Sequence, residues 1–242
     1  MKKYFRFPYL ILIFIIFFSL FNKSLFARDS TRVSFLLQNK KNLFTSISFG
    51  MGVDYSNNPS LKKFIQYTIP QYNTLSPSDQ LSDFASGLEF FGGVERQISK
   101  NFSIKAEYSY FLKSYNVSVF PLYDFSYVNQ QPYLIFNYII PHDFFYIKMG
   151  AGAGYILSKL TVKQFGGEKS YTSSGLGLKI ESVLNAQISK SVATYLSAYI
   201  YNTMLQNLKD SGGNELVSSN GDKVNLNSFG IGLRLGVEVY IF

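Results

Sequence analysis

The sequence contains no cysteine and no tryptophan, and it has a single histidine. Without cysteine the chain forms no disulfide and has no lipid-attachment site, and one histidine makes a zinc or other transition-metal site unexpected. Charged residues make up only 16% of the 242 residues, against about 25% in ordinary soluble domains. After the N-terminus there is no apolar run of about 18 residues, which a membrane-spanning helix requires.

What the sequence contains instead is a large apolar and aromatic fraction. Apolar residues reach 47% and aromatic residues 18%, while the mean hydropathy stays near zero at +0.05. The chain is therefore too apolar for a disordered protein and too evenly mixed for a helical membrane protein. Intermediate hydropathy with many Tyr and Phe side chains is typical of a transmembrane barrel, because only alternate residues of each strand face lipid.

The first 27 residues have the features of an export signal. A charged start with Lys2, Lys3 and Arg6 precedes an apolar stretch at residues 9–21, and Ala27 ends a candidate cleavage site. We therefore expect a signal peptide at residues 1–27. The alternative is that this segment remains as an uncleaved anchor helix.

Two regions are expected after the signal. Residues 28–41 form a basic periplasmic lead-in, and residues 42–242 form the barrel domain. The formal net charge falls from +8 to +4 when the four basic residues of the signal are removed. The basic pI of 9.4 therefore gives no reason to expect a nucleic-acid partner, and we read the lead-in as a solvated segment.

The end of the chain shows the clearest strand pattern. Every odd position of residues 229–241 is apolar, and most even positions hold glycine or a charged residue. This period of two predicts a strand with one apolar face, and its length exceeds the roughly 9–11 residues that a tilted strand needs to cross a bilayer. Similar alternation predicts earlier strands near residues 43–55, 87–95, 102–113, 125–140, 145–157, 175–188 and 192–205.

The connections between these strands alternate in length. Tight turns are expected near residues 99–101, 141–143 and 189–191. Long loops are expected at residues 56–83, 116–124, 159–174 and 207–225. Short periplasmic turns and long external loops are typical of outer-membrane barrels, whose sheets must close because an open edge in lipid leaves backbone groups unsatisfied. The prediction is an all-β fold: an eight-stranded antiparallel up-and-down transmembrane β-barrel with both termini in the periplasm.

With its signal, its eight strands and its final residues Tyr240-Ile241-Phe242, the chain resembles the small outer-membrane β-barrel proteins of Gram-negative-type bacteria. These include OmpX-like, OmpA-barrel-like and opacity-protein-like barrels, and the resemblance covers residues 42–242. It implies insertion into the outer membrane by the barrel-assembly machinery, with Tyr240 and Phe242 as the C-terminal assembly signal. Both residues share parity with Glu238, so either a bulge switches the face near Tyr240 or the terminal ring lies at the periplasmic mouth.

The polar faces of the strands carry charges of both signs that should point into the barrel. They are Glu89, Glu95, Lys105, Glu107, Lys113, Lys148, Lys179, Glu181, Arg234 and Glu238. Because eight strands enclose a space that side chains fill, we expect these charges to pair, with Arg234 meeting Glu89, Glu107 or Glu181. Inward glycines are expected to make room for the long side chains. The alternative is a narrow ion path or a proton relay.

Enzyme chemistry and cofactors are not expected. His142 lies in a predicted periplasmic turn, the wrong end for a substrate in the outer leaflet, although a carboxylate pair remains formally open as a catalytic group. Gly150, Gly152 and Gly154 alternate inside a predicted strand with no helix after them, whereas a dinucleotide site needs a turn between a strand and a helix.

Any binding specificity should lie in the external loops. The loop at residues 56–83 contains Phe64, Ile65, Tyr67 and Tyr72, which would bind an extracellular ligand or cap the barrel mouth. Lysines in the third loop could meet lipopolysaccharide phosphates. The sequence favours a monomeric structural or surface-interaction barrel that contacts outer-membrane lipid and lipopolysaccharide. The alternatives are a narrow pore, an accessory barrel of a secretion or envelope-assembly system, and a lipid-modifying enzyme.

Overall fold

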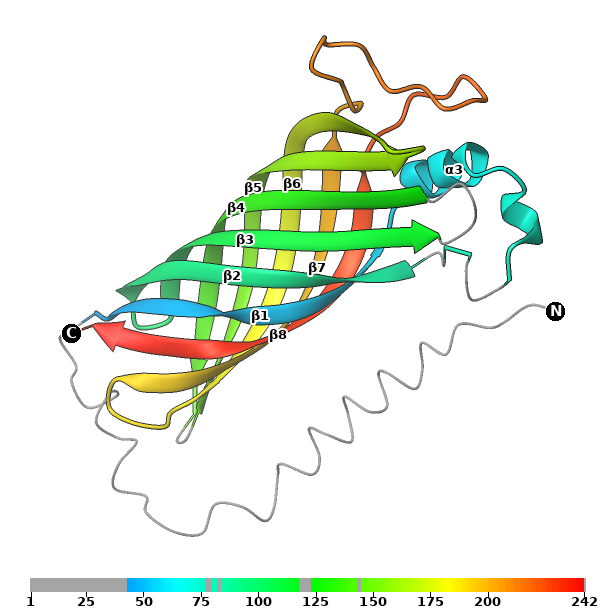
Figure 1. Ribbon diagram of the computed structural model, residues 1–242. Coiled ribbons are helices and arrows are strands. Elements are labelled where there is room, and N and C mark those ends of the chain that lie inside the picture. Colours follow the sequence, from blue (N-terminus) through cyan, green and yellow to red (C-terminus); the bar gives the residue numbers. More distant parts are fainter. Residues whose placement is uncertain (1–42, 77–79, 82–83, 118–122, 143–144, 242) are drawn as a thin grey trace. The chain divides into compact units, whose positions relative to one another are not determined.

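A computed structural model shows that eight strands close into one antiparallel barrel (Figure 1). The structure describes residues 43–76, 80–81, 84–117, 123–142 and 145–241. The expected signal peptide, the expected lead-in and Phe242 lie outside the described residues. Among those described, no helix has both the length and the apolar character needed to cross a membrane.

The strands follow one another around the barrel in chain order. They are β1 (Thr45–Asn57), β2 (Phe84–Ser99), β3 (Phe102–Val117), β4 (Tyr123–Pro141), β5 (Phe145–Gln164), β6 (Gly167–Ala186), β7 (Val192–Leu205) and β8 (Ser228–Ile241). Every neighbouring pair is antiparallel, and β8 closes the barrel on β1, with Thr45 opposite Ile241 and Asn57 opposite Phe229. The predicted fold class is therefore confirmed.

The two ends of the barrel differ in their connections. Tight turns join β2 to β3, β4 to β5 and β6 to β7 at one end, which we call the turn end. The opposite end, the loop end, carries the other connections and the helix α3 (Pro59–Thr68). In Figure 1 α3 lies at the loop end, and the C-terminus lies at the other end of the barrel.

The prediction of a loop at residues 159–174 is wrong. β5 continues to Gln164 and β6 starts at Gly167, so the two strands form a long hairpin. Phe165 and Gly166 form its two-residue turn, with φ of 53° and 76°. Positive φ at both turn residues matches the twist of the flanking strands. The segment was misread because its outward residues are polar, as in a loop.

The prediction of an irregular loop at residues 56–83 is also wrong in part. β1 extends to Asn57 and is followed by α3 and by a short 3-10 helix at Tyr72–Thr74. Pro59 opens α3, where its missing N–H removes no helical hydrogen bond. Leu61, Phe64 and Ile65 recur at helical spacing on one face, and all three are buried.

Pro132 interrupts the hydrogen-bond ladder of β4 without shifting its register. On either side Gln130 pairs with Leu157 and Tyr133 pairs with Gly154, so the register between β4 and β5 is unchanged and no bulge occurs there. Pro132 lacks an N–H group, and the two pairs at Gln131 and Pro132 are missing from this ladder.

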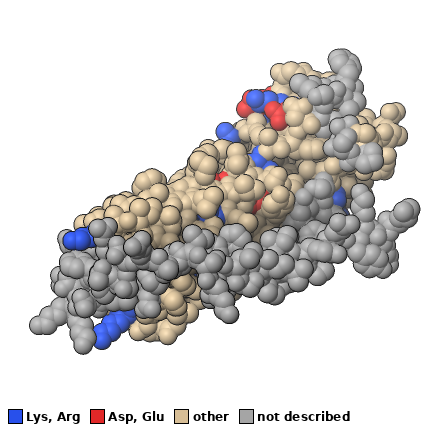
Figure 2. Space-filling view, turned by 90° about the horizontal axis from the view of Figure 1, so that it is seen from below, with Lys and Arg blue, Asp and Glu red and all other residues tan. Residues whose placement is uncertain are grey.

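The outward faces of the strands form an apolar belt around the barrel. On β8 every outward residue is apolar, and on β5 the outward apolar row runs from Ile147 to Leu157. This span of 11 residues fits the roughly 9–11 residues that cross a bilayer. In Figure 2 the blue and red atoms gather toward the two ends, and the described surface between them is mostly tan.

Toward the loop end the same strands reverse their polarity. In the part of β5 that carries the belt, Met149 and Leu157 face outward and Lys148 faces inward. Beyond the belt, Leu160 faces inward and is fully buried, whereas Lys163 faces outward. We call these two parts of the molecule the belt region and the cap region.

Candidate functional site

The interior of the belt region is organised around Arg234 on β8. Arg234 lies opposite Gly52 of β1, where a Cβ atom would come within 2.8 Å of the arginine Cγ. Its Nε and Nη2 atoms donate to the two carboxylate oxygens of Glu89 at 2.7 and 2.5 Å, and Nη1 donates to Glu107 at 2.8 Å. Glu181 lies 3.8 Å from Nη1, so Arg234 meets all three carboxylates that the sequence offered.

Two lysines complete this central cluster. Lys179 donates to one oxygen of Glu107 at 2.8 Å, and Lys105 lies 2.8 Å from the other. Lys105 also donates to Glu181. The central cluster, defined as Glu89, Lys105, Glu107, Lys179, Glu181 and Arg234, balances three cations against three carboxylates. Its side chains are almost completely buried, so each charge depends on the others for neutralisation.

A second cluster lies nearer the turn end and is centred on Lys148 of β5. The lysine Nζ lies 2.6 Å from Glu95 and 2.8 Å from Glu238. The hydroxyl of Ser46 and the side-chain amide of Asn185 each donate to Glu238 at 2.5 Å. This turn-end cluster has one more carboxylate than cations, and the neutral donors offset part of the cost of burying the extra charge.

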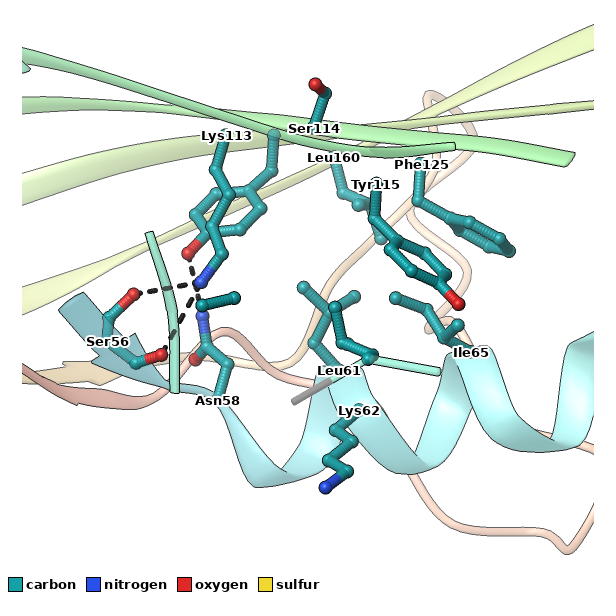
Figure 3. A pocket seen from close by; sticks show the side chains of 13 residues that line it. Ser56, Asn58, Leu61, Lys62, Ile65, Lys113, Ser114, Tyr115, Phe125 and Leu160 are labelled. Carbon is teal, nitrogen blue, oxygen red and sulfur yellow. Dashed lines mark hydrogen bonds between the residues drawn. The ribbon is translucent and has the colours of Figure 1, made fainter. Parts of the chain in front are cut away.

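Lys113 is separate from both clusters. It lies on β3 near the loop end, and it makes no ion pair with any residue that the structure describes. Its Nζ donates to the hydroxyl of Ser56 at 3.1 Å and lies 5.8 Å from the centre of the Tyr127 ring. Figure 3 shows Lys113 reaching toward Ser56 in the space between the strands and α3. The structure thus joins nine of the ten predicted charges in ion pairs and leaves Lys113 outside.

Asp54 is a buried carboxylate missing from the predicted charge set. It accepts hydrogen bonds from Tyr199 at 3.1 Å and from Tyr201 at 2.9 Å. The Tyr199 hydroxyl also lies 2.6 Å from Glu89, which links Asp54 to the central cluster. The sequence contained a signal for its inward position, because Asp54 shares parity with Gly52 on β1.

Tyrosine rings from β7 cover the glycines of β8. A Cβ atom at Gly230 would lie 2.5 Å from the Tyr201 ring, and Tyr199 covers Gly232 in the same way. The guanidinium of Arg234 lies 4.3 Å from the centre of the Tyr199 ring, a cation–π distance. These glycines therefore make room for aromatic rings, whereas the sequence suggested room for lysine and arginine.

The cap region is closed by apolar packing. Leu61, Phe64 and Ile65 of α3 pack in one buried cluster with inward side chains of β4 and β5, including Phe125 and Leu160. The cap, which we define by α3, Ile69, Tyr72 and the buried residues of the β7–β8 connection, covers this inner face. The buried apolar residues of that connection are Leu208, Leu216, Val224 and Leu226.

The β7–β8 connection contains an eight-residue repeat that the sequence analysis missed. The segments 207–214 (NLKDSGGN) and 215–222 (ELVSSNGD) match position by position in their buried leucine and in a glycine with positive φ. The N–H of Leu208 donates to Val224, that of Leu216 to Leu208 and that of Val224 to Leu216, at 2.7–3.0 Å. These three backbone hydrogen bonds close a ring, and the spacing of eight was visible in the sequence.

Little space remains beneath α3. A cavity of about 20 Å³ lies between the helix and the strands, with Leu61, Ile65 and Lys113 among its lining residues (Figure 3). Asn58, with its amide oriented to satisfy both polar atoms, accepts from the Tyr127 hydroxyl at 3.0 Å and donates to backbone carbonyls just before β8. A cavity of this size holds one water molecule, far below the roughly 300 Å³ of a small ligand site.

Tyr240 faces inward at the turn end. Its side chain is buried, and its ring packs edge-on against Phe44 at 5.2 Å and against Tyr146 at 6.3 Å. The β1–β8 register runs without a shift to Ile241, so no bulge switches the face before Tyr240. The assembly role of Tyr240 and Phe242 stays a prediction.

His142 lies at the turn end, as expected. Its ring stacks on Phe145 at 4.5 Å, and its backbone N–H donates to the Phe145 carbonyl at 2.9 Å. Within the described part of the chain, no three His, Cys, Asp or Glu residues are grouped to hold a metal ion. The absence of enzyme activity stays a prediction.

Comparison with known proteins gives similarity of fold. No protein-family model and no curated protein sequence matches the chain. The solved structures that it resembles include Neisserial surface protein A, with 12% identity over 81% of this chain and 96% of that one, at a TM-score of 0.48. The chain is an eight-stranded barrel, like the family that its sequence resembles.

Two further structures show the same level of similarity. Ail of Yersinia pestis, solved in complex with the heparin analogue sucrose octasulfate, has 11% identity over 83% of this chain and 99% of that one, at a TM-score of 0.47. The outer membrane protease OmpT of Escherichia coli has 9% identity over 88% of this chain and 100% of that one, at a TM-score of 0.44.

Proposed function

We propose that this chain is an integral outer-membrane β-barrel protein with a closed lumen and a structural or surface-interaction role. The closed sheet and the apolar belt support the membrane location. A belt residue such as Leu235 is 66% exposed, and a ring of such side chains is favourable only against lipid. The tight turns would face the periplasm and the loop end the exterior.

The observation that carries the closed lumen is the burial of nine charged side chains in ion pairs. Eight strands enclose an interior that side chains can fill, and here Arg234 and its partners fill it. The cap then covers the mouth with apolar side chains such as Phe64 and Leu160. An ion would have to pass both barriers, so the arrangement favours a non-conducting barrel over a pore.

The loop end supports the surface-interaction role. Phe165 is 73% exposed at the turn of the β5–β6 hairpin, and Tyr67 on α3 and Val217 in the β7–β8 connection are also largely exposed. In a region whose outer face is otherwise polar, exposed apolar side chains are candidates for contact with another molecule. The regular strands beneath them would hold this surface in a fixed shape.

Two measurements test the proposal. The mature chain should sediment with the dense membrane fraction and shift its gel mobility on heating, because a closed barrel resists unfolding in cold detergent. In planar bilayers it should give no conductance steps. Recovery as a soluble periplasmic protein would overturn the membrane location. A conductance step in the unmodified protein, enlarged in Arg234→Ala, would replace the closed lumen with a pore.

A further inference from the structure

A groove of about 720 Å³ lies on the outer wall of the barrel, where the belt gives way to polar residues. Strands β3 to β6 form its floor, and residues 206–209 after β7 form one side. Its lining includes Tyr110, Val128, Leu157, Lys159, Thr172 and Lys209. This volume is typical of a small-molecule site, unlike the cavity beneath α3.

The register of the strands determines which lining residues are neighbours. Tyr110 and Leu157 share one cross-strand row, each beside the same residue of β4. One row nearer the loop end, Lys159 pairs with Thr172, and Thr172 pairs with Lys209. Two backbone hydrogen bonds of 2.8 and 2.9 Å hold Lys209 against Thr172. The lower edge of the groove therefore holds Tyr110 and Leu157 on either side of Gln130, and the upper edge has a lysine on either side of Thr172.

The two lysines form no ion pair with a described residue. Lys209 lies opposite Glu215 in the β7–β8 connection, and the carboxylate of Glu215 lies 2.6 Å from Lys223. Lys163, farther along the β5–β6 hairpin, lies 3.6 Å from Glu168. The groove thus places two lysines without an ion pair at the border of the belt.

We propose that this groove binds the phosphorylated headgroup of a glycolipid in the outer leaflet. A phosphate would sit between Lys159 and Lys209, where two ammonium groups offer charge-assisted hydrogen bonds. Hydroxyl and amide side chains of the groove, such as Thr161 and Gln206, face the sugar. An acyl chain would continue over Leu157 onto the belt. The inference rests on the proposed membrane location, because only then does this wall face lipid.

A lipid is favoured over a protein partner because the floor of the groove is continuous with the belt. Leu157 and Tyr110 belong to the same outward rows that run down toward the turn end. An occupant must therefore combine an anionic head with an apolar tail. A phosphoglycolipid has both, and its phosphate lies at the level where the belt ends.

The test compares lipid binding in two double variants. The refolded mature chain in detergent micelles is titrated with diphosphorylated lipid A, and bound lipid is counted by native mass spectrometry. Lys159→Gln/Lys209→Gln should weaken binding about tenfold or more, because both charge-assisted contacts to the phosphate are lost. The matched control, Lys63→Gln/Lys163→Gln, removes the same charge from two exposed lysines that do not line the groove, and it should change binding less than twofold.

Two further arms identify the ligand chemistry. Dephosphorylated lipid A should bind at least tenfold more weakly than the diphosphorylated form, and excess inorganic phosphate should leave the bound lipid in place. Three results would overturn the proposed lipid site. They are equal weakening in both double variants, equal binding of the two forms of lipid A, and displacement of the lipid by inorganic phosphate. Heat-modifiable mobility of every variant is read in parallel. If mobility and membrane sedimentation hold while the groove fails, the proposed function stands without it.

Discussion

The belt region and the cap region are built from the same strands with opposite polarity. In the belt region the interior holds charges such as Arg234 and Glu107, and the outside is apolar. In the cap region the interior holds apolar residues such as Leu160 and Phe125, and the outside carries lysines and hydroxyl groups. A strand therefore has no fixed inner character, because the medium on its outer side decides which face must be apolar.

The two interiors are stabilised by different forces. Ion pairs fill the belt region because a membrane-embedded wall gains nothing by turning its apolar side chains away from lipid. The cap region faces water, so burying apolar side chains there stabilises it at about 25 cal/mol per Å². Substitutions that remove a charge from the belt interior or an apolar side chain from the cap interior should therefore distinguish the two forces.

The largest effect is expected for Arg234→Met. The change leaves Glu89 and Glu107 without their main partner in the barrel interior, which should lower the free energy of unfolding by about 3–5 kcal/mol. Urea unfolding in micelles measures this. Arg96, an exposed residue at the turn end that donates to Thr45 at 2.6 Å, is the control, and Arg96→Met should cost less than about 0.5 kcal/mol. Equal losses of stability in Arg234→Met and Arg96→Met would show that the buried ion pairs contribute no more than an exposed side chain.

A cavity in the cap should have a smaller and more local effect. Leu160→Ala removes a fully buried side chain and should cost about 3 kcal/mol. The loss should appear as faster proteolysis of α3 and of the β7–β8 connection, while the belt region keeps its heat-modifiable mobility. Thr161→Ala, on the outer face of the same strand, is the control. Loss of the whole barrel in Leu160→Ala would mean that the two regions fold as one unit.

A third experiment asks whether exposed apolar residues differ between the regions. Leu235→Arg turns a charge toward lipid and should cost about 2–4 kcal/mol near the midplane. Val217, an exposed residue of the cap region, should accept arginine at less than about 0.5 kcal/mol because its surroundings are water. Thermal unfolding of both variants in lipid vesicles measures the difference in stability loss. A larger loss for Val217→Arg than for Leu235→Arg would mean that the membrane does not surround the belt region.

The smallest effect is expected at the two turns of the eight-residue repeat. Asp210 accepts backbone hydrogen bonds from Gly212 and Asn214, both at 2.9 Å, and these bonds lower the pKa of its carboxyl. Its stabilisation is therefore present above the unfolded pKa of about 3.9 and is lost as the pH falls through the lower folded value. Amide chemical shifts of Gly212 should follow this titration.

The second turn provides the internal control for that titration. Ser218 occupies the position equivalent to Asp210, and it bears no carboxyl group. Asp222 lies next to Gly221, so the variant Asp210→Asn supplies the comparison. It should abolish the response of Gly212 and leave the amide of Gly221, which donates to the Ser218 carbonyl at 2.9 Å, as in the unmodified chain. A changed response of both amides would mean that the loop end responds to acid as a whole.

Much of the barrel was predictable because the alternation of apolar and polar residues can be read from the sequence alone. The outward row of β8 and the closure of the sheet follow from a period of two over a membrane-length strand. The polarity reversal was not predictable in the same way, because a period of two looks identical whichever face is inside. Phe125 was therefore predicted only as the start of a strand with no assigned face, and Leu160 as part of a loop, although both belong to the core of the cap.

The candidate site was predictable in its members and not in its contacts. Sequence parity placed Arg234 and Glu89 inside, but which carboxylate receives the arginine depends on how the strands close around the barrel. The roles of the glycines were the hardest to predict, because Gly52 makes room for an arginine and Gly232 makes room for Tyr199. Gly232→Ser should therefore displace the Tyr199 ring.

The hydrogen-bonded ring of the β7–β8 connection has a consequence for how the surface of this protein can vary. The ring involves only the backbone of Leu208, Leu216 and Val224, and the two turns project from it at residues 210–214 and 218–222. Exposed polar turns tolerate exchange and insertion far better than the backbone that supports them. The ring therefore acts as a fixed support, on which substitutions or a grafted peptide can change both turns while the barrel beneath keeps its fold.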